Sequence, residues 1–225
     1  MQGRVVAVTG GCGVLGRAVI AELAARGAKP IAIDIATGGA PTEAADAFLG
    51  QDISAPAAAE ALLGDIVAKH GTLDGVVNIA GGFVWQTVSE GAPESWERLY
   101  RLNVGTAYAM SRAAIPHLAN SRGAIVNIGA NGAVKAAAGM GAYAASKAGV
   151  HKLTESLAEE LKDQGVRVNA VLPSIIDTPV NRKDMPDASF DRWVAPGSLA
   201  KVIAFLLSDD AEAITGALLP VTGRV

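Results

Sequence analysis

A tyrosine and a lysine four residues apart are the side chains of this sequence best suited to acid–base chemistry. Tyr143 and Lys147 lie at the start of a helix-like stretch, residues 143–162, and residues four apart share one face of a helix. A cation beside a phenol stabilises the phenolate, so we expect Lys147 to lower the pKa of Tyr143 and to make it a general acid and base near neutral pH. The alternative interpretation is a surface tyrosine followed by an exposed lysine.

A glycine-rich loop near the N-terminus is suited to binding phosphate. Residues 9–16 contain Gly10, Gly13 and Gly16, and the loop lies between a β-branched run and an amphipathic helix-like stretch. Glycines permit a tight turn and let backbone N–H groups approach a pyrophosphate at a helix N-terminus. The strand–turn–helix context favours this interpretation over an ordinary glycine-rich turn.

An acidic residue at the end of the second predicted strand indicates which dinucleotide is bound. Asp34 lies 18 residues after Gly16. A carboxylate at that point accepts hydrogen bonds from both hydroxyls of an adenosine ribose and repels a 2′-phosphate. The sequence therefore predicts NAD(H) in preference to NADP(H). The alternative is a solvated carboxylate with no ligand.

Short β-branched runs alternate with helix-like stretches, which is typical of a doubly wound α/β fold with a parallel sheet. The predicted strands are residues 5–8, 30–35, 47–49, 75–79, 124–128, 166–172 and 218–221. The predicted helices are residues 14–26, 57–69, 94–118, 143–162 and 199–207. No linker or repeat divides the chain, so we predict a single domain over residues 1–225. Within it the irregular segment 174–198 is expected to be a lid or substrate loop.

Composition and charge exclude several classes of function. The 225 residues are 50% hydrophobic and 18% charged, which suits a large core and excludes intrinsic disorder. A net charge of −3 without a basic stripe argues against nucleic acid and anionic membranes as partners. One cysteine, Cys12, excludes an internal disulfide, and His70, His117 and His151 lack metal-ligand spacing. With no evident signal peptide or membrane-spanning run, we expect a cytoplasmic protein.

The glycine loop, Asp34 and the Tyr143–Lys147 pair together resemble the motifs of the short-chain dehydrogenase/reductases, and the resemblance covers essentially the whole chain. It implies a Rossmann-like fold with a parallel sheet of about seven strands. It also implies an NAD(P)-dependent oxidoreductase with a small-molecule substrate, and a nicotinamide cofactor at the carboxyl ends of the strands. Members of the family commonly assemble, so a homodimer or homotetramer is expected.

The resemblance assigns roles to further residues. The catalytic residues that it implies are Tyr143, Lys147 and Asn103, the last of which orders a water in a proton relay. The cofactor-binding residues given by the loop, by Asp34 and by the resemblance are Gly10, Gly13, Leu15, Gly16, Asp34, Asp52, Ile53, Asn78, Ala80, Gly81, Tyr143, Lys147, Pro173, Ile176 and Thr178. In that set Asp52 matches a contact to the adenine, and Thr178 matches a contact to the nicotinamide carboxamide.

Two departures from the family pattern bear on function. Val14 occupies the place of the loop's middle glycine, with Gly13 one position earlier, so the loop is expected to differ locally. Ala130 occupies the place of the catalytic serine, 13 residues before Tyr143. No hydroxyl is then present to polarise a carbonyl substrate, and the adjacent Asn131 is a candidate hydrogen-bond donor.

One branch of the family, dihydropteridine reductase, also lacks this serine, and residues 78–83 and 129–193 resemble that branch. The resemblance implies reduction of a quinonoid dihydropterin by NADH, with Tyr143 as the proton donor. Phe83, Trp85 and Trp193 are candidates for the walls of a planar substrate site, and ordinary packing is the alternative for each.

Three hypotheses about function follow. The first is the NADH-dependent reduction of a pterin-like or other conjugated small molecule. The second is a reductase or dehydrogenase of ketones, sugars or 3-oxoacyl thioesters, in which Asn131 stands in for serine. The third is a non-catalytic NAD(H)-binding sensor, against which the intact Tyr143, Lys147 and Asn103 argue.

Overall fold

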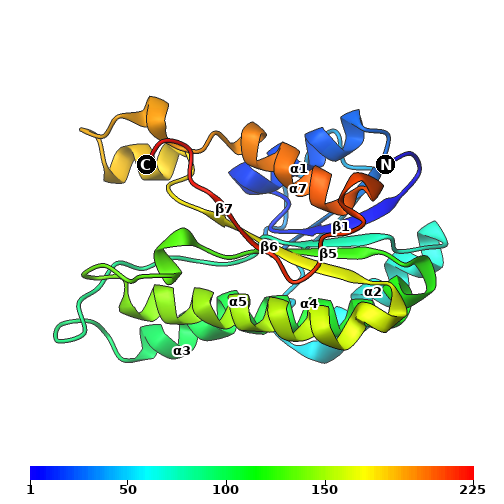
Figure 1. Ribbon diagram of the computed structural model, residues 1–225, viewed down its shortest axis with the longest axis horizontal. Coiled ribbons are helices and arrows are strands. Elements are labelled where there is room, and N and C mark those ends of the chain that lie inside the picture. Colours follow the sequence, from blue (N-terminus) through cyan, green and yellow to red (C-terminus); the bar gives the residue numbers. More distant parts are fainter.

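A parallel sheet of seven strands forms the centre of the protein, in the order β3-β2-β1-β4-β5-β6-β7 (Figure 1). This computed structural model describes residues 1–225. The strands are β1 Val5–Thr9, β2 Lys29–Asp34, β3 Asp46–Leu49, β4 Gly75–Asn78, β5 Ala124–Ile128, β6 Arg167–Pro173 and β7 Leu218–Val221. Every neighbouring pair is parallel. The predicted fold class and all seven predicted strands are confirmed, with strand ends shifted by at most one residue.

Helices cover both faces of the sheet. α1 and α7 pack on one face, while α2, α4 and α5 pack on the other (Figure 1). The α-helices are α1 Val14–Ala25, α2 Pro56–His70, α3 Glu94–Tyr100, α4 Thr106–Ser121, α5 Gly141–Leu161, α6 Pro179–Asp184 and α7 Pro196–Leu207. Because both faces are covered, β1, β4 and β5 are buried along their whole length, as their near-continuous apolar sequences require. None of the helices is long and apolar enough to cross a bilayer.

The chain reverses its winding direction at β1, whose two neighbours are β2 and β4. From β1 the chain builds the β2–β3 side first and then crosses to β4 and the remaining strands. In open parallel sheets, ligands bind outside the carboxyl ends of the strands at such a switch point. The loops that follow β1, β2 and β4 are therefore the ones positioned to form a site.

The helix predicted over residues 94–118 is wrong in its continuity. α3 ends at Tyr100, a π-helical turn follows over Arg101–Gly105, and α4 begins at Thr106. The turn contains Asn103, whose side chain is hydrogen-bonded to the backbone N–H and C=O of Gly82. Single π-helical turns are frequent at functional sites because they change the direction of one side chain. Hydrophobic periodicity does not reveal such a turn.

The segment predicted as irregular, residues 174–198, contains two short pieces of helix. α6 starts from Thr178, whose hydroxyl accepts a hydrogen bond from the Asn181 N–H. A single turn follows over Phe190–Arg192. Ile176 pairs with Val194, which ties the beginning of the segment to its end.

Candidate active site

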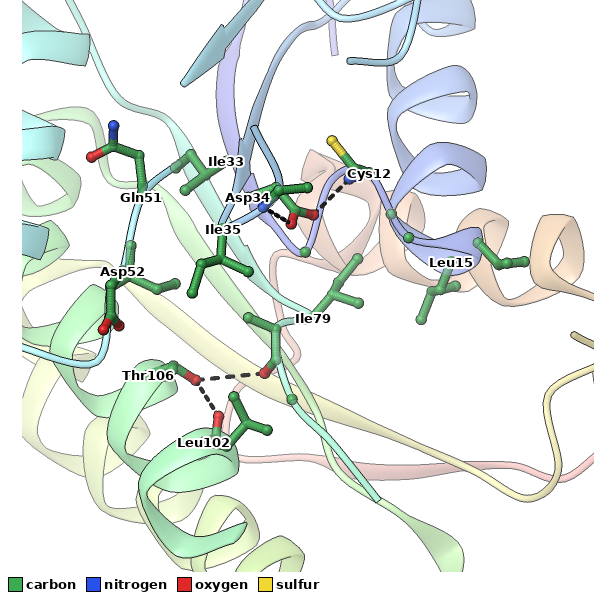
Figure 2. A pocket seen from close by; sticks show the side chains of 18 of the residues that line it. Cys12, Leu15, Ile33, Asp34, Ile35, Gln51, Asp52, Ile79, Leu102 and Thr106 are labelled. Atoms are coloured by element: carbon green, nitrogen blue, oxygen red, sulfur yellow. Dashed lines mark hydrogen bonds between the residues drawn. The ribbon is translucent and has the colours of Figure 1, made fainter. Parts of the chain in front are cut away.

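A pocket of about 590 Å³ opens at the carboxyl ends of β1, β2 and β4 (Figure 2). It brings together most of the residues predicted to bind a cofactor, namely Gly10, Gly13, Leu15, Gly16, Asp34, Asp52, Ile53, Ala80, Gly81 and Thr178. The other residues in that prediction do not line this pocket; they are Asn78, Tyr143, Lys147, Pro173 and Ile176. Thr106 and Val180 also line it, and no motif in the sequence indicated them.

The glycine loop packs so tightly that side chains are excluded at two positions. Gly10 has a positive φ of 66°, and a Cβ there would lie 3.1 Å from the Ala80 backbone nitrogen. A Cβ on Gly16 would collide with the Gly10 carbonyl and would lie 2.8 Å from the Gly11 Cα. The loop thereby brings the N-terminus of α1 into the pocket, where its first N–H groups have no acceptor within the helix.

The predicted local difference at Val14 has little consequence for this geometry. Gly13 serves as the N-cap of α1 in an extended conformation, and Val14 is the first residue of the helix. The Val14 side chain is 43% exposed and lines the pocket. It therefore does not fill the space that Gly16 leaves between the loop and the helix.

Asp34 is held at the edge of the pocket by backbone donors from two loops (Figure 2). One carboxylate oxygen accepts the Cys12 N–H at 2.9 Å, and the other accepts the Ala36 N–H at 2.9 Å. No lysine or arginine forms an ion pair with it. The nearby Arg17 guanidinium instead donates to the carbonyls of Cys12 and Gly39. The carboxylate is therefore fixed in place without a neutralising cation.

The ends of β1 and β4 are joined beneath the pocket. The Thr9 hydroxyl accepts hydrogen bonds from the backbone N–H groups of Ile79 and Ala80, at 3.0 and 3.1 Å. Asn78, predicted to bind the cofactor, points instead into the interior. Its amide donates to Asn127 Oδ1 at 2.8 Å and to Ser111 Oγ at 3.1 Å. Asn78 therefore supports the floor of the site and does not line it.

Lys147 is buried beside the end of β5. Its Nζ donates to the Ile128 carbonyl at 2.7 Å, and it lies 3.6 Å from the position that a Cβ on Gly81 would occupy. Glycine at position 81 thus leaves the lysine room next to the pocket. Lys147 and Tyr143 both belong to the first two turns of α5.

Asn103 is linked to the start of α5 through a serine that the sequence analysis did not single out. Asn103 Nδ2 donates to Ser146 Oγ at 2.9 Å, and the Ser146 hydroxyl donates to the Tyr143 carbonyl at 2.7 Å. Asn103 Oδ1 also accepts the Gly82 N–H. Hydrogen bonds therefore join the π-helical turn, the loop after β4 and the first turn of α5 next to Tyr143.

The expectation that Lys147 lowers the pKa of Tyr143 is wrong for this structure. Burial raises the pKa of Tyr143 to about 12 and lowers the pKa of Lys147 to about 8. Removal from water disfavours both the phenolate and the ammonium, and burial is the cause of both shifts. Tyr143 is thereby kept as a neutral phenol, which is the form that donates a proton.

The substrate side of the site has no hydroxyl at the position of the family serine. Ala130 is 4% exposed, and its backbone N–H donates to Nε2 of the buried His151 at 3.3 Å. Asn131 opens a turn of 3₁₀ helix. Asn131 makes no side-chain hydrogen bond within the protein, so its amide is free to bind a ligand. His151, which the sequence left as an isolated histidine, is thus in contact with the active-site turn.

The three aromatic residues predicted to wall the substrate site lie in different surroundings, and only Phe83 contacts Tyr143. Phe83 meets Tyr143 edge-to-face, with ring centroids 5.0 Å apart, and is 53% exposed. Trp85 lies against the backbone of Gly139 and is 61% exposed. Trp193, predicted to wall the substrate site, is only 7% exposed and packs on Phe190 at 4.8 Å. It is a packing residue of the segment that follows β6.

Of the other predicted cofactor residues, Asp52 lines the pocket, whereas Pro173 and Ile176 do not. Asp52 accepts the Ser54 N–H at 3.0 Å, and this hydrogen bond lowers the pKa of its carboxyl. Pro173 ends β6, and Ile176 follows it where the chain pairs with Val194. A parallel sheet with a glycine cradle, a fixed acidic residue and a half-buried tyrosine followed one turn later by a buried lysine defines a dinucleotide-dependent oxidoreductase.

The chain belongs to the short chain dehydrogenase family, whose model matches residues 4–189. It is 33% identical to the 3-oxoacyl-[acyl-carrier-protein] reductase FabG of Escherichia coli (strain K12), over 99% of this chain and 97% of that protein. It is 31% identical to the meso-2,3-butanediol dehydrogenase of Serratia marcescens, over 98% and 93% of the two chains. These matches confirm the predicted family and an NAD(P)-dependent oxidoreductase.

A solved relative has the same fold. The crystal structure of 3-ketoacyl-(acyl-carrier-protein) reductase from Brucella melitensis, complexed with NADH, superimposes with a TM-score of 0.88 at 31% identity. The match covers 99% of this chain and 98% of that one. A nicotinamide cofactor therefore fits the family and the glycine cradle found here.

Proposed function

We propose that this protein is an NADH-dependent reductase of a planar, electron-poor conjugated molecule, of which a quinonoid dihydropterin is the example that we would test first. The observation that carries the proposal is Ala130. A ketone needs a hydrogen-bond donor on its oxygen as negative charge develops, and removing such a donor from an active site typically slows the reaction by roughly 100- to 1000-fold. A conjugated imine that accepts hydride spreads that charge over its own ring system.

The cofactor would be held by residues on the loops after β1, β3 and β6, at the end of β2 and on α5. The N–H groups at the start of α1 suit the pyrophosphate, Asp34 suits the adenosine ribose, and Asp52 suits the adenine. At the other end, Thr178 and Lys147 suit the carboxamide and the nicotinamide ribose. The chemistry that such a cofactor supplies when bound is hydride transfer.

Tyr143 would donate the proton that completes the reduction. Its raised pKa keeps the phenol protonated across the physiological range, so the donor is ready before the substrate arrives. Lys147 and Asn103 hold the start of α5 against β5 and the loop after β4. Phe83, exposed against Tyr143, and Trp85, exposed against Gly139, offer flat apolar surfaces to a planar substrate.

The second candidate is a reductase of 3-oxoacyl thioesters. It is favoured by the relatives named 3-oxoacyl-[acyl-carrier-protein] reductase, which match almost the full length of this chain. In this case the free amide of Asn131 would take over the donor role of the family's serine. The matching relatives favour this substrate, while Ala130 favours the conjugated acceptor.

A pair of substrates and one variant separate the two candidates. The purified protein is mixed with NADH and either a chemically generated quinonoid dihydropterin or a 3-oxoacyl thioester, and loss of NADH absorbance is followed above the non-enzymatic rate. We expect turnover of the dihydropterin. We also expect Ala130→Ser to raise thioester reduction by about tenfold or more, with a much smaller effect on the dihydropterin.

Efficient thioester reduction by the unmodified protein, with no dihydropterin turnover, would reverse the order of the candidates. If neither acceptor is reduced although NADH binds, the reductase proposal fails for both classes. The same protein, run with NADPH, measures the proposed preference for NADH.

We also propose that the protein forms a homodimer or homotetramer. α3 and α4 carry the exposed aromatic side chains Trp96, Tyr100 and Tyr108 on the side of the sheet away from α1, and such groups are enriched at interfaces. Analytical ultracentrifugation tests the proposal, and a single 22.8 kDa species would contradict it.

A further inference from the structure

We propose that His151 is a positioning residue of the active site. Its neutral imidazole holds the turn after β5 through the Ala130 N–H, and the turn so held presents the Asn131 amide to the substrate. The substrate-facing half of this inference rests on the function proposed above. The contact between His151 and the Ala130 N–H does not depend on that function, and a separate experiment tests it.

Two side chains one helical turn apart on α5 hold the end of β5. Lys147 Nζ donates to the carbonyl of Ile128, and His151 Nε2 accepts the N–H of Ala130. Gly129 lies between these two contacts. A Cβ at that position would lie 2.6 Å from His151 Nε2 and 2.8 Å from its Cδ2, so only glycine allows the ring to reach the backbone.

The anchored turn leads directly to Asn131. The Ala130 carbonyl accepts the Ala133 N–H at 3.1 Å, and the Asn131 carbonyl accepts the Val134 N–H at 3.1 Å. Both backbone polar groups of Ala130 are therefore used inside the protein, and its methyl group offers no hydrogen bond. Asn131 is therefore the residue of this turn whose polar side chain remains available to hydrogen-bond a substrate.

The contact requires the uncharged form of the imidazole. Nε2 accepts a hydrogen bond only when its lone pair is free, which places the ring proton on Nδ1, and an imidazolium has no such lone pair. Burial and the neighbouring charge of Lys147 lower the pKa of His151, with Glu155 opposing and Lys152 adding to the shift. Below that pKa the ring would face the Ala130 N–H with a second N–H.

Three variants test the effect on catalysis. His151→Leu removes the acceptor at similar volume, His151→Gln keeps an acceptor near the position of Nε2 but does not titrate, and Asn131→Ala removes the presented amide. We expect His151→Leu to lower kcat/KM about 10- to 100-fold, as for a buried N–H left unpaired. The dissociation constant of NADH, measured by fluorescence, should stay within about twofold because Ala130, Asn131 and His151 do not line the pocket proposed to bind it.

Rescue by His151→Gln and the coupling between His151 and Asn131 distinguish a positioning role of His151 from a general contribution to the stability of the fold. We expect kcat/KM of the unmodified enzyme to fall at a pH below the ordinary histidine pKa of 6.5. His151→Gln should recover most of the lost kcat/KM and should lack this acid limb. The double variant with Asn131→Ala should be no slower than the slower single variant, because both changes remove the same interaction. Additive losses, or a His151→Gln variant as slow as His151→Leu with the acid limb intact, would overturn the proposal.

Nuclear magnetic resonance tests the anchor without any substrate. Two-bond nitrogen–proton spectra should show Nε2 of His151 unprotonated at neutral pH, and Ala130 should exchange its amide proton slowly. The protection factor of this amide, which corrects for the slower intrinsic exchange at lower pH, should fall about tenfold or more in His151→Leu and on acidification of the unmodified protein. An Nε2-protonated ring, or Ala130 exchange that ignores both changes, would refute the anchor. Failure of every acceptor tested, with the anchor present, would instead count against the proposed function.

Discussion

The strongest prediction concerns the choice between NADH and NADPH. Asp34→Asn removes one negative charge at the edge of the pocket and keeps the size of the side chain. In the structure the carboxylate accepts N–H groups from Cys12 and Ala36 at 2.9 Å each, and no lysine or arginine is paired with it. A 2′-phosphate on the adenosine ribose would therefore meet this charge directly.

The size of the effect follows from Coulomb's law. A phosphate of charge about −2 placed roughly 5 Å from the carboxylate, at an effective dielectric constant of about 40 for a partly exposed group, is repelled by about 3 kcal/mol. Salt screening reduces this to about 2–3 kcal/mol. Each 1.4 kcal/mol is about tenfold. The ratio of kcat/KM for NADPH to that for NADH should thus rise roughly 30- to 150-fold.

The substitution also has a cost for NADH. An amide can accept only one of the two backbone N–H groups, because its nitrogen is a donor, and one N–H is left unpaired. We therefore expect the KM for NADH to rise by about tenfold while kcat changes little. Steady-state kinetics with both cofactors at fixed ionic strength measures the ratio and the KM together.

Asp52→Asn is the matched control, because it removes an equal charge from the same pocket at the end assigned to the adenine. The NADPH to NADH ratio of Asp52→Asn should stay within about threefold of the unmodified protein. If Asp34→Asn leaves the ratio unchanged, or if both variants shift it equally, then local repulsion by Asp34 is not the basis of the preference.

Three further predictions concern the glycine loop, Tyr143 and Lys147. Gly16→Ala should abolish NADH binding and lower the unfolding free energy by about 1–3 kcal/mol in urea titrations, because its Cβ would collide with the carbonyl of Gly10. Gly13→Ala is the control: its Cβ would lie 3.3 Å from the same carbonyl, and this variant should still bind NADH. Tyr143→Phe should lower kcat by about 100- to 10,000-fold with NADH affinity retained, and full activity would refute the role of proton donor. The pKa of Lys147 is lowered from 10.5 to about 8, so between these values the unfolded chain binds a proton that the folded one does not. The stability of the unmodified protein should therefore rise with pH across that interval relative to Lys147→Met, by up to about 3 kcal/mol in denaturant titrations, and parallel curves would contradict this.

Much of the fold and of the cofactor site could be predicted because the signals are local in the sequence. Buried parallel strands have continuous apolar sequences, and glycines in a strand–turn–helix context identify the loop with Gly10 and Gly16. Asp34 was found from its position at a strand end. In each case the residues that reveal the feature are also the ones that form it.

The residues that sequence reasoning missed depend on contacts between distant segments. His151 is one of three histidines with no motif around it, and only the packing of α5 on β5 brings its ring to Ala130. Ser146 gains its role from Asn103, 43 residues away. The pKa of Tyr143 was expected to fall because Lys147 is near in sequence, yet burial raises it. Desolvation depends on everything around a group, and a four-residue spacing contains no information about it.

The replacement of serine by alanine in this site is more than a loss of one hydroxyl. Tyr143, Lys147 and His151 recur every four residues along α5 and form one row on that helix, and Lys147 and His151 both contact the end of β5. The row provides a cation bound to the Ile128 carbonyl, an acceptor for the N–H of Ala130 and, in the proposed mechanism, the proton donor Tyr143. A serine at position 130 would regain a hydroxyl but would still sit on a turn held by His151 and followed by a free Asn131 amide. We therefore expect Ala130→Ser to gain carbonyl reduction while keeping the activity toward conjugated acceptors, because the two activities depend on different groups of the same turn.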